Sequence, residues 1–202
     1  MKKAALMVLC LGAAGAAHAQ NNVTLYGVVT GGVGYVNKVG LSPASARQTG
    51  SRWGMDSGQY TQSRFGMRGT EDLGGGLKAN FVIEGGLTID NGASAQNGAT
   101  FGRRTTIGLT GSAGSIELGR RKDYTDIIGN QFATTTRMLP FTAKAHANGM
   151  DRATGARANN MVFYLTPNWN GFQGNLTYAF GEQAGDFQSG RAFGFGGTYK
   201  NG

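Results

Sequence analysis

The sequence predicts an all-β protein whose antiparallel strands form a barrel in a membrane. Short segments alternate apolar and polar residues with a period of 2, as strands with one buried face do. The connections between these segments alternate between short and long. No run reaches the roughly 20 apolar residues that a membrane-spanning helix needs. The chain contains 36 glycines in 202 residues, and many lie inside the strand-like segments, where they allow curvature and close backbone approach.

The first residues predict a secretory signal peptide over 1–19. Lys2 and Lys3 precede an apolar core over 4–12, and Ala17-His18-Ala19 forms a small-x-small cleavage site. The only cysteine, Cys10, lies inside this segment. The mature chain, 20–202, therefore has no cysteine, which excludes disulfides and thiol chemistry.

Eight segments have the alternation of strands, and parity assigns a face to each residue. In the first, Leu25 and Tyr35 share an apolar face opposite Tyr26; in the second, Phe65 lies opposite Arg64. In the sixth, Met161, Phe163 and Leu165 place apolar residues on the polar face. The expected strands are 23–35, 63–69, 77–84, 104–110, 115–120, 160–165, 172–180 and 193–199, with Arg157 and Asn159 continuing the polar face of the sixth.

The connections favour a membrane barrel over a soluble sandwich. Membrane barrels have short turns at one end and long loops at the other, whereas a two-sheet sandwich has no reason to separate its loops by length. An eight-stranded barrel is filled by side chains, but the polar face here is rich in Gly, Thr and Asn. We therefore expect about eight strands of a larger barrel. The connections are 36–62, 70–76, 88–101, 111–114, 123–156, 166–171 and 181–191.

The segment 123–156 is the longest connection and has no sustained period. Loops of this length are usually functional or disordered. Arg120 and Arg121 precede it, and Arg152 and Arg157 lie near its end. A long loop between barrel strands can fold inward and narrow a pore, which makes 123–156 the candidate constriction loop.

The sequence excludes histidine-based catalysis and histidine metal sites. His146 is the only histidine after the signal peptide, so a histidine metal site or a histidine-based triad is not available. The glycine-rich stretch 71–78 lacks the spacing of a phosphate loop and is expected to be a turn. We expect no enzyme activity and no cofactor. The formal net charge of +8 suits anionic solutes or surfaces at least as well as nucleic acid, and we expect no nucleic-acid partner.

Five motifs resemble the general porins of Gram-negative bacteria, particularly the neisserial and β-proteobacterial type. They are NVTLYG (22–27), SRFGMRGTEDLGGGLK (63–78), IGLTG (107–111), LGR (118–120) and NMVFYLTPN (160–168). The resemblance implies a homotrimer of sixteen-stranded barrels in the outer membrane, reached through the periplasm and surrounded by lipid. Each barrel would have a water-filled pore narrowed by its third external loop. This chain would supply the signal peptide and the first eight strands.

The resemblance also implies which residues line the constriction. Arg64, Arg104 and Arg157 fall on the family's arginine positions, and Arg68 extends the row. Arg103 is a further candidate, although it has the parity of the apolar face. The loop would contribute Asp123, Asp126, Arg137, Lys144, Asp151 and Arg152.

Three departures from the family pattern point to a preference for anions. The acids of the loop are few, its proline motif is reduced to 139–141, and Thr30 stands where many relatives carry an acid. We expect passive diffusion of small anionic and neutral solutes. Two alternatives remain: a small eight-stranded outer-membrane adhesin or structural barrel without a conducting pore, and a secreted basic binding protein with a β-sandwich core.

Overall fold

The computed structural model describes residues 22–40, 49–58, 61–122 and 157–200. Within these ranges the chain forms strands and no helix, and so contains no helix that could cross a membrane. The all-β prediction is confirmed. The strands are β1 (Asn22–Val28), β2 (Gly31–Gly40), β3 (Thr49–Ser57), β4 (Arg64–Gly74), β5 (Leu77–Gly86), β6 (Arg104–Gly111), β7 (Gly114–Lys122), β8 (Arg157–Leu165), β9 (Phe172–Ala179) and β10 (Ala192–Tyr199).

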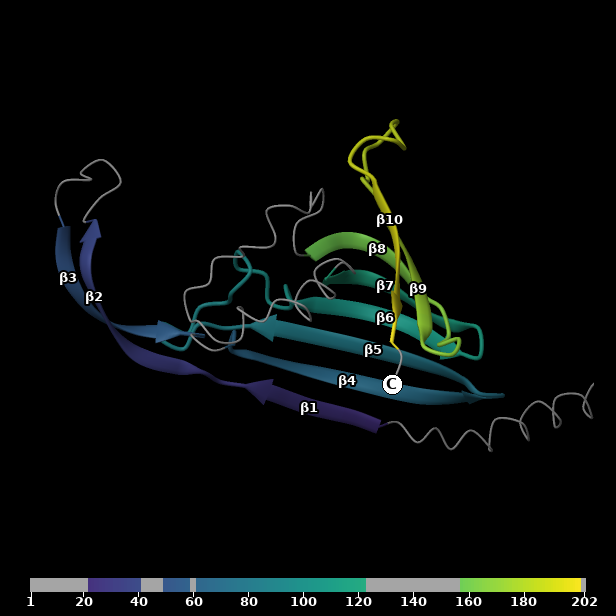
Figure 1. Ribbon diagram of the computed structural model, residues 1–202, viewed down its shortest axis with the longest axis horizontal. Coiled ribbons are helices and arrows are strands. Elements are labelled where there is room, and N and C mark those ends of the chain that lie inside the picture. Colours follow the sequence, from purple (N-terminus) through teal and green to yellow (C-terminus); the bar gives the residue numbers. More distant parts are fainter. Residues whose placement is uncertain (1–21, 41–48, 59–60, 123–156, 201–202) are drawn as a thin grey trace, which may run out of the picture.

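Eight strands form one antiparallel sheet in the order β1-β4-β5-β6-β7-β8-β9-β10. From β4 to β10, neighbours in the sheet are also neighbours in sequence, which is an up-and-down meander. β2 and β3 form a separate hairpin that projects away from this sheet (Figure 1). The large sheet is open, with β1 and β10 at its two edges.

The predicted first strand and first connection were wrong in detail. The expected strand 23–35 is divided, because β1 ends at Val28 and β2 begins at Gly31. The expected connection 36–62 contains all of β3. At the division, the backbone N–H of Thr30 donates to Ser63 Oγ at 2.9 Å, and that hydroxyl donates to the Thr30 carbonyl at 3.0 Å. A side chain thus takes the place of a strand neighbour where the hairpin leaves the sheet.

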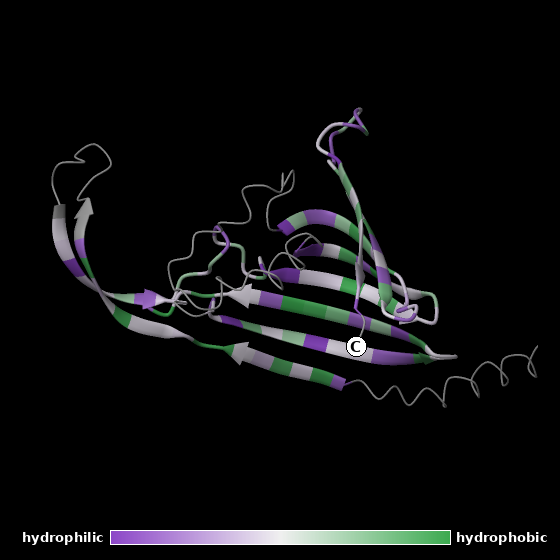
Figure 2. Cartoon of the chain, in the orientation of Figure 1, coloured by the Kyte–Doolittle hydropathy of each residue, from purple (hydrophilic) through white to green (hydrophobic). Residues whose placement is uncertain are grey.

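One face of the large sheet carries continuous apolar rows. Directly opposed residues of neighbouring antiparallel strands share a face, so the pairing register defines each row. The alternation is visible as bands along the strands in Figure 2. One row crosses all eight strands through Val23, Gly69, Phe81, Ile107, Leu118, Val162, Tyr178 and Phe193.

The apolar face is exposed to the surroundings of the sheet. Phe193 and Phe195 are 78% and 83% exposed. A continuous band of exposed apolar side chains is what a membrane strand presents to lipid. The four buried hydrophobic residues of the described chain do not belong to this face. They lie on β8 and at the end of β9, and are Ala158, Met161, Phe163 and Ala179.

Met161 and Phe163 belong to the polar face. Met161 is paired with Gly119 and Phe163 with Glu117, and Glu117 bonds Arg104. The apolar residues that interrupt the sequence alternation of β8 therefore form a local apolar patch on an otherwise polar surface.

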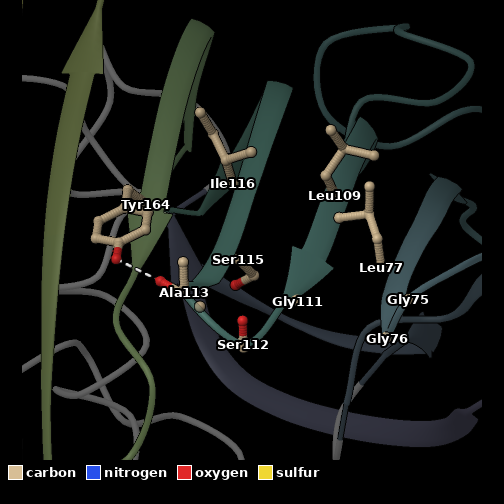
Figure 3. Close-up of a pocket in the computed structure, with 11 residues that line it drawn as sticks. Gly75, Gly76, Leu77, Leu109, Gly111, Ser112, Ala113, Ser115, Ile116 and Tyr164 are labelled. Atoms are coloured by element: carbon tan, nitrogen blue, oxygen red, sulfur yellow. Dashed lines mark hydrogen bonds between the residues drawn. The ribbon is translucent and has the colours of Figure 1, made fainter.

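The short turns gather at one end of the sheet. Gly74, Gly75 and Gly76 have φ of +84°, +62° and +80° between β4 and β5, a left-handed conformation that glycine adopts without steric cost. Beside this turn, Leu77, Leu109, Ile116 and Tyr164 line a shallow pocket on the apolar face, where the Tyr164 hydroxyl donates to the Ala113 carbonyl at 2.5 Å (Figure 3). A tyrosine with its hydroxyl at the turns and its ring against aliphatic side chains suits a membrane interface.

Candidate functional site

Glu84 on β5 is the centre of the first of two charged clusters on the polar face. Its Oε1 lies 2.6 Å from Arg103 Nε, and its Oε2 lies 3.8 Å from Arg64 Nε. The Tyr26 hydroxyl donates to Oε2 at 3.0 Å. The Glu84 cluster, Tyr26, Arg64, Glu84 and Arg103, therefore joins β1, β4 and β5 to the segment before β6.

Gly66 makes the contact between Tyr26 and Glu84 possible. It lies on β4 between these two residues and is paired with both. A Cβ at this position would lie 3.0 Å from the Tyr26 ring and hydroxyl and 2.6 Å from the Ile83 carbonyl. Glycine here removes the side chain over which Tyr26 would otherwise have to reach.

Glu117 on β7 is the centre of the second cluster. One carboxylate oxygen, Oε2, lies 2.6 Å from Arg104 Nη2 and 2.7 Å from Arg121 Nη1. The Arg121 guanidinium carbon lies 3.6 Å from the centroid of the Phe163 ring. The Glu117 cluster, Arg104, Glu117, Arg121 and Phe163, extends the charged surface across β6, β7 and β8.

Arg68 makes no ion pair within the described part of the chain. It lies on β4 with its guanidinium carbon 5.6 Å from the centroid of the Tyr26 ring. Its position in the register, opposite Thr24 and Val82, places it on the same face as Arg64. Arg68 is therefore a positive charge that neither glutamate of the two clusters neutralises.

An irregularity in β8 moves Arg157 off the polar face on which strand alternation had placed it. The register shifts between Gly119 and Arg121, so that Arg121 opposes Ala158 and Lys122 opposes Arg157. Asn160 has a φ of +54°, as expected where an extra residue is accommodated in a strand. The Arg157 side chain instead donates from Nε to the Arg103 carbonyl at 3.0 Å.

Arg103 shows why parity alone was insufficient. It precedes the first residue of β6, so the strand alternation does not govern it. Its Nη1 donates to Gln62 Oε1 at 2.5 Å while its Nε contacts Glu84. The structure thus gathers Arg64, Arg103 and Arg104 where β4 and β6 begin and β5 ends, with Arg68 further along β4.

Six predicted site residues, Asp123, Asp126, Arg137, Lys144, Asp151 and Arg152, lie outside the described residues, as does the predicted signal peptide. In the described ranges no cluster of His, Cys, Asp or Glu is arranged to hold a metal ion.

The sequence prediction of the site omitted Glu84, Glu117 and Arg121. Parity already placed both glutamates opposite apolar residues inside strands, where a charge requires a partner. That signal would have identified them as counter-charges. In the described chain, the clusters with Arg68 bring five arginines to a surface that holds two glutamates, so positive charge is in excess.

The comparisons with known proteins agree with this geometry. Residues 4–202 match the Gram-negative porin family. The outer membrane porin protein 32 of Delftia acidovorans is 40% identical over 188 residues, covering 91% of this chain and 51% of that protein. A major outer membrane protein P.IB of Neisseria meningitidis is 31% identical over 204 residues, covering 100% of this chain and 56% of that protein.

A solved structure gives the same result in three dimensions. The anion-selective porin from Comamonas acidovorans superposes with a TM-score of 0.68 and 36% sequence identity, over 91% of this chain and 55% of that one. The chain spans about half the length of the curated relatives that it matches. The resemblance to porins is confirmed, and the chain belongs to the Gram-negative porin family.

Proposed function

We propose that this chain forms part of an outer-membrane porin that passes small hydrophilic solutes and ions by passive diffusion and prefers anions. The observation that carries the proposal is the excess of arginine over glutamate on the polar face of the sheet. The apolar rows of the other face would contact outer-membrane lipid. The likeness to porins supports a homotrimer that acts as a channel and catalyses no reaction.

The proposed mechanism of selectivity is electrostatic. Fixed positive charges lining a narrow opening with low-dielectric walls raise the local concentration of anions and lower that of cations. Glu84 and Glu117 each pair with two arginines but offset only one positive charge each. Arg68 and the remaining surplus would set the net preference.

We propose that the segment 123–156 narrows the channel. It connects β7 to β8, and β8 carries Phe163 and Met161 on the polar face. These side chains are 3% and 2% exposed on the polar face. An apolar patch on the wall of a water-filled channel needs a cover, and a loop that folds inward supplies one.

Because the chain spans about half the length of its relatives, the first experiment compares it with a longer version. Planar-bilayer reversal potentials are measured across a salt gradient for the 202-residue chain and for a version extended by the second half of a related porin. We expect the extended protein to conduct and its potential to report anions. Conduction by the short chain alone would show that these strands assemble a pore by themselves, and a cation-selective extended protein would overturn the proposed preference.

The second test replaces three of the arginines. The triple change Arg64→Gln, Arg104→Gln and Arg157→Gln in the extended protein should move the reversal potential toward the cation side. The difference from wild type should shrink as salt approaches about 1 M, where the Debye length is about 3 Å. Arg52→Gln is the matched control, because Arg52 pairs with Asp56 on the projecting hairpin. An unchanged potential in the triple variant would reject the arginine assignment.

A further inference from the structure

Arg121 differs in its burial from Arg104, the other arginine that pairs with Glu117. It is 8% exposed, and its guanidinium lies between the Phe163 ring and the Glu117 carboxylate. A solute in the channel therefore has little access to it. Its charge is offset at 2.7 Å by a carboxylate that it shares with Arg104.

Two glycines beside Glu117 leave room for its carboxylate to lie between Arg104 and Arg121. Gly108 is paired with Glu117 across β6 and β7, and a Cβ there would lie 3.0 Å from Glu117 Cγ and 2.5 Å from the Ile116 carbonyl. Gly119 lies between Glu117 and Arg121 along β7, with no side chain to separate them. The Glu117 carboxylate is therefore confined, at 15% side-chain exposure, between two arginines.

Stacking on Phe163 supplies a contact that is independent of the ion pair. A guanidinium stacks face to face on an aromatic ring, whereas an ammonium lacks the planar surface to do so. Phe163 is itself 3% exposed. The ring fixes Arg121, Arg121 fixes Glu117 Oε2, and that oxygen lies 2.6 Å from Arg104 Nη2.

We propose that Arg121 is a positioning residue, which sets the ion selectivity of the channel through Glu117 and Arg104 without itself facing the solutes. The proposal rests on the channel function proposed above. It assigns to Phe163 the task of holding Arg121, and to Glu117 the task of orienting Arg104. Arg104 alone of these residues, at 35% side-chain exposure, presents its charge to the channel.

The electrical test is a double-mutant cycle in the extended protein. Arg121→Lys keeps the charge but removes the stacked plane, and should lower the ratio of anion to cation permeability by about twofold or more, as coupled residues do. In an Arg104→Gln background the same change should have no further effect. Arg120→Lys is the matched control, since Arg120 is opposite Thr105 on the apolar side and donates to the Gly102 carbonyl. An equal decrease in both backgrounds, or none in either, would overturn the proposal.

A spectroscopic test does not depend on conduction. The Nε–H proton of Arg121 in micelles should show an upfield ring-current shift that Phe163→Leu removes. Arg121→Lys should also speed solvent exchange of the Arg104 Nε–H, which donates to Thr106 Oγ1 at 3.1 Å, and Arg120→Lys should not. If Arg121 shows no ring-current shift, or if Arg104 exchange is unaffected, the positioning role is rejected even where the channel conducts as proposed.

Discussion

Single glycines decide where charged side chains of the polar face can meet. Gly66 lies between Tyr26 and Glu84, and Gly108 and Gly119 flank Glu117. Each position lies on the polar face of the sheet, and a larger residue at Gly66 or Gly108 would crowd a glutamate or its hydrogen-bonding partner. The glycine content of the chain is thus tied to the clusters as well as to curvature.

Gly119→Ala should destabilise the protein strongly. Gly119 has a φ of +125°, and an added Cβ would lie 2.1 Å from the Thr105 carbonyl oxygen. Forcing a non-glycine residue into such a conformation costs about 1–3 kcal/mol. Gly194→Ala is the control, because a Cβ there meets nothing within 4 Å, and it should be neutral or slightly stabilising. Guanidinium unfolding of the extended protein in micelles measures both, and equal midpoints for the two variants would contradict this prediction.

Parity predicted part of the site and failed at identifiable residues. It placed Arg64, Arg68 and Arg104 on the polar face because these lie within regular strands. It misplaced Arg103, which precedes β6 and is oriented by Glu84 instead. It also missed the consequence of the irregularity at Asn160, because nothing in the sequence marks an extra residue before the register is known.

Among the elements, the β2–β3 hairpin was the least predictable. β3 contains Gly and Asp, which are depleted in strands, although Trp53 and Met55 alternate with Arg52 and Gly54. Tyr35 on β2 packs against Trp53 with ring centroids 4.9 Å apart. The strands of the large sheet were predicted more closely, because their alternation is reinforced by apolar neighbours on both sides.

Ser63 is the residue through which β1 and β4 hold the base of this hairpin. Ser63 is 1% exposed, and its hydroxyl bonds both backbone groups of Thr30, while Thr30 Oγ1 donates to the Thr61 carbonyl. These three hydrogen bonds join the chain after β1 to the chain before β4, at the point where ladder pairing stops.

Ser63→Ala should therefore lower the free energy of unfolding by about 1–3 kcal/mol, since it leaves the part-buried N–H of Thr30 without its acceptor. Ser112→Ala is a matched control, because Ser112 lies exposed in the turn between β6 and β7. Denaturant unfolding in micelles measures both changes. The interpretation fails if the two serine variants are equally stable.

At the scale of the whole molecule, the apolar rows favour a lipid environment, whereas the open edges of the sheet do not. The rows suit contact with lipid, but a bilayer offers no hydrogen bonds to the unpaired backbone groups of β1 and β10. The fold class followed from the sequence because alternation and connection length are local properties. Which strands pair with the backbone groups of the two edges, β1 and β10, is not a local property of the sequence.

Hydrogen exchange in micelles should reveal those edges. In the 202-residue chain the amides of β1 and β10 that lack a neighbouring strand should exchange rapidly, because edge backbone groups open to solvent without disrupting the sheet. In the version extended by a related porin's second half, the same amides should become protected as the sheet closes. β6 provides an internal control, since β5 and β7 flank it in both proteins. Strong protection of β1 and β10 in the short chain would mean that its edges are already paired, with each other or with a second copy.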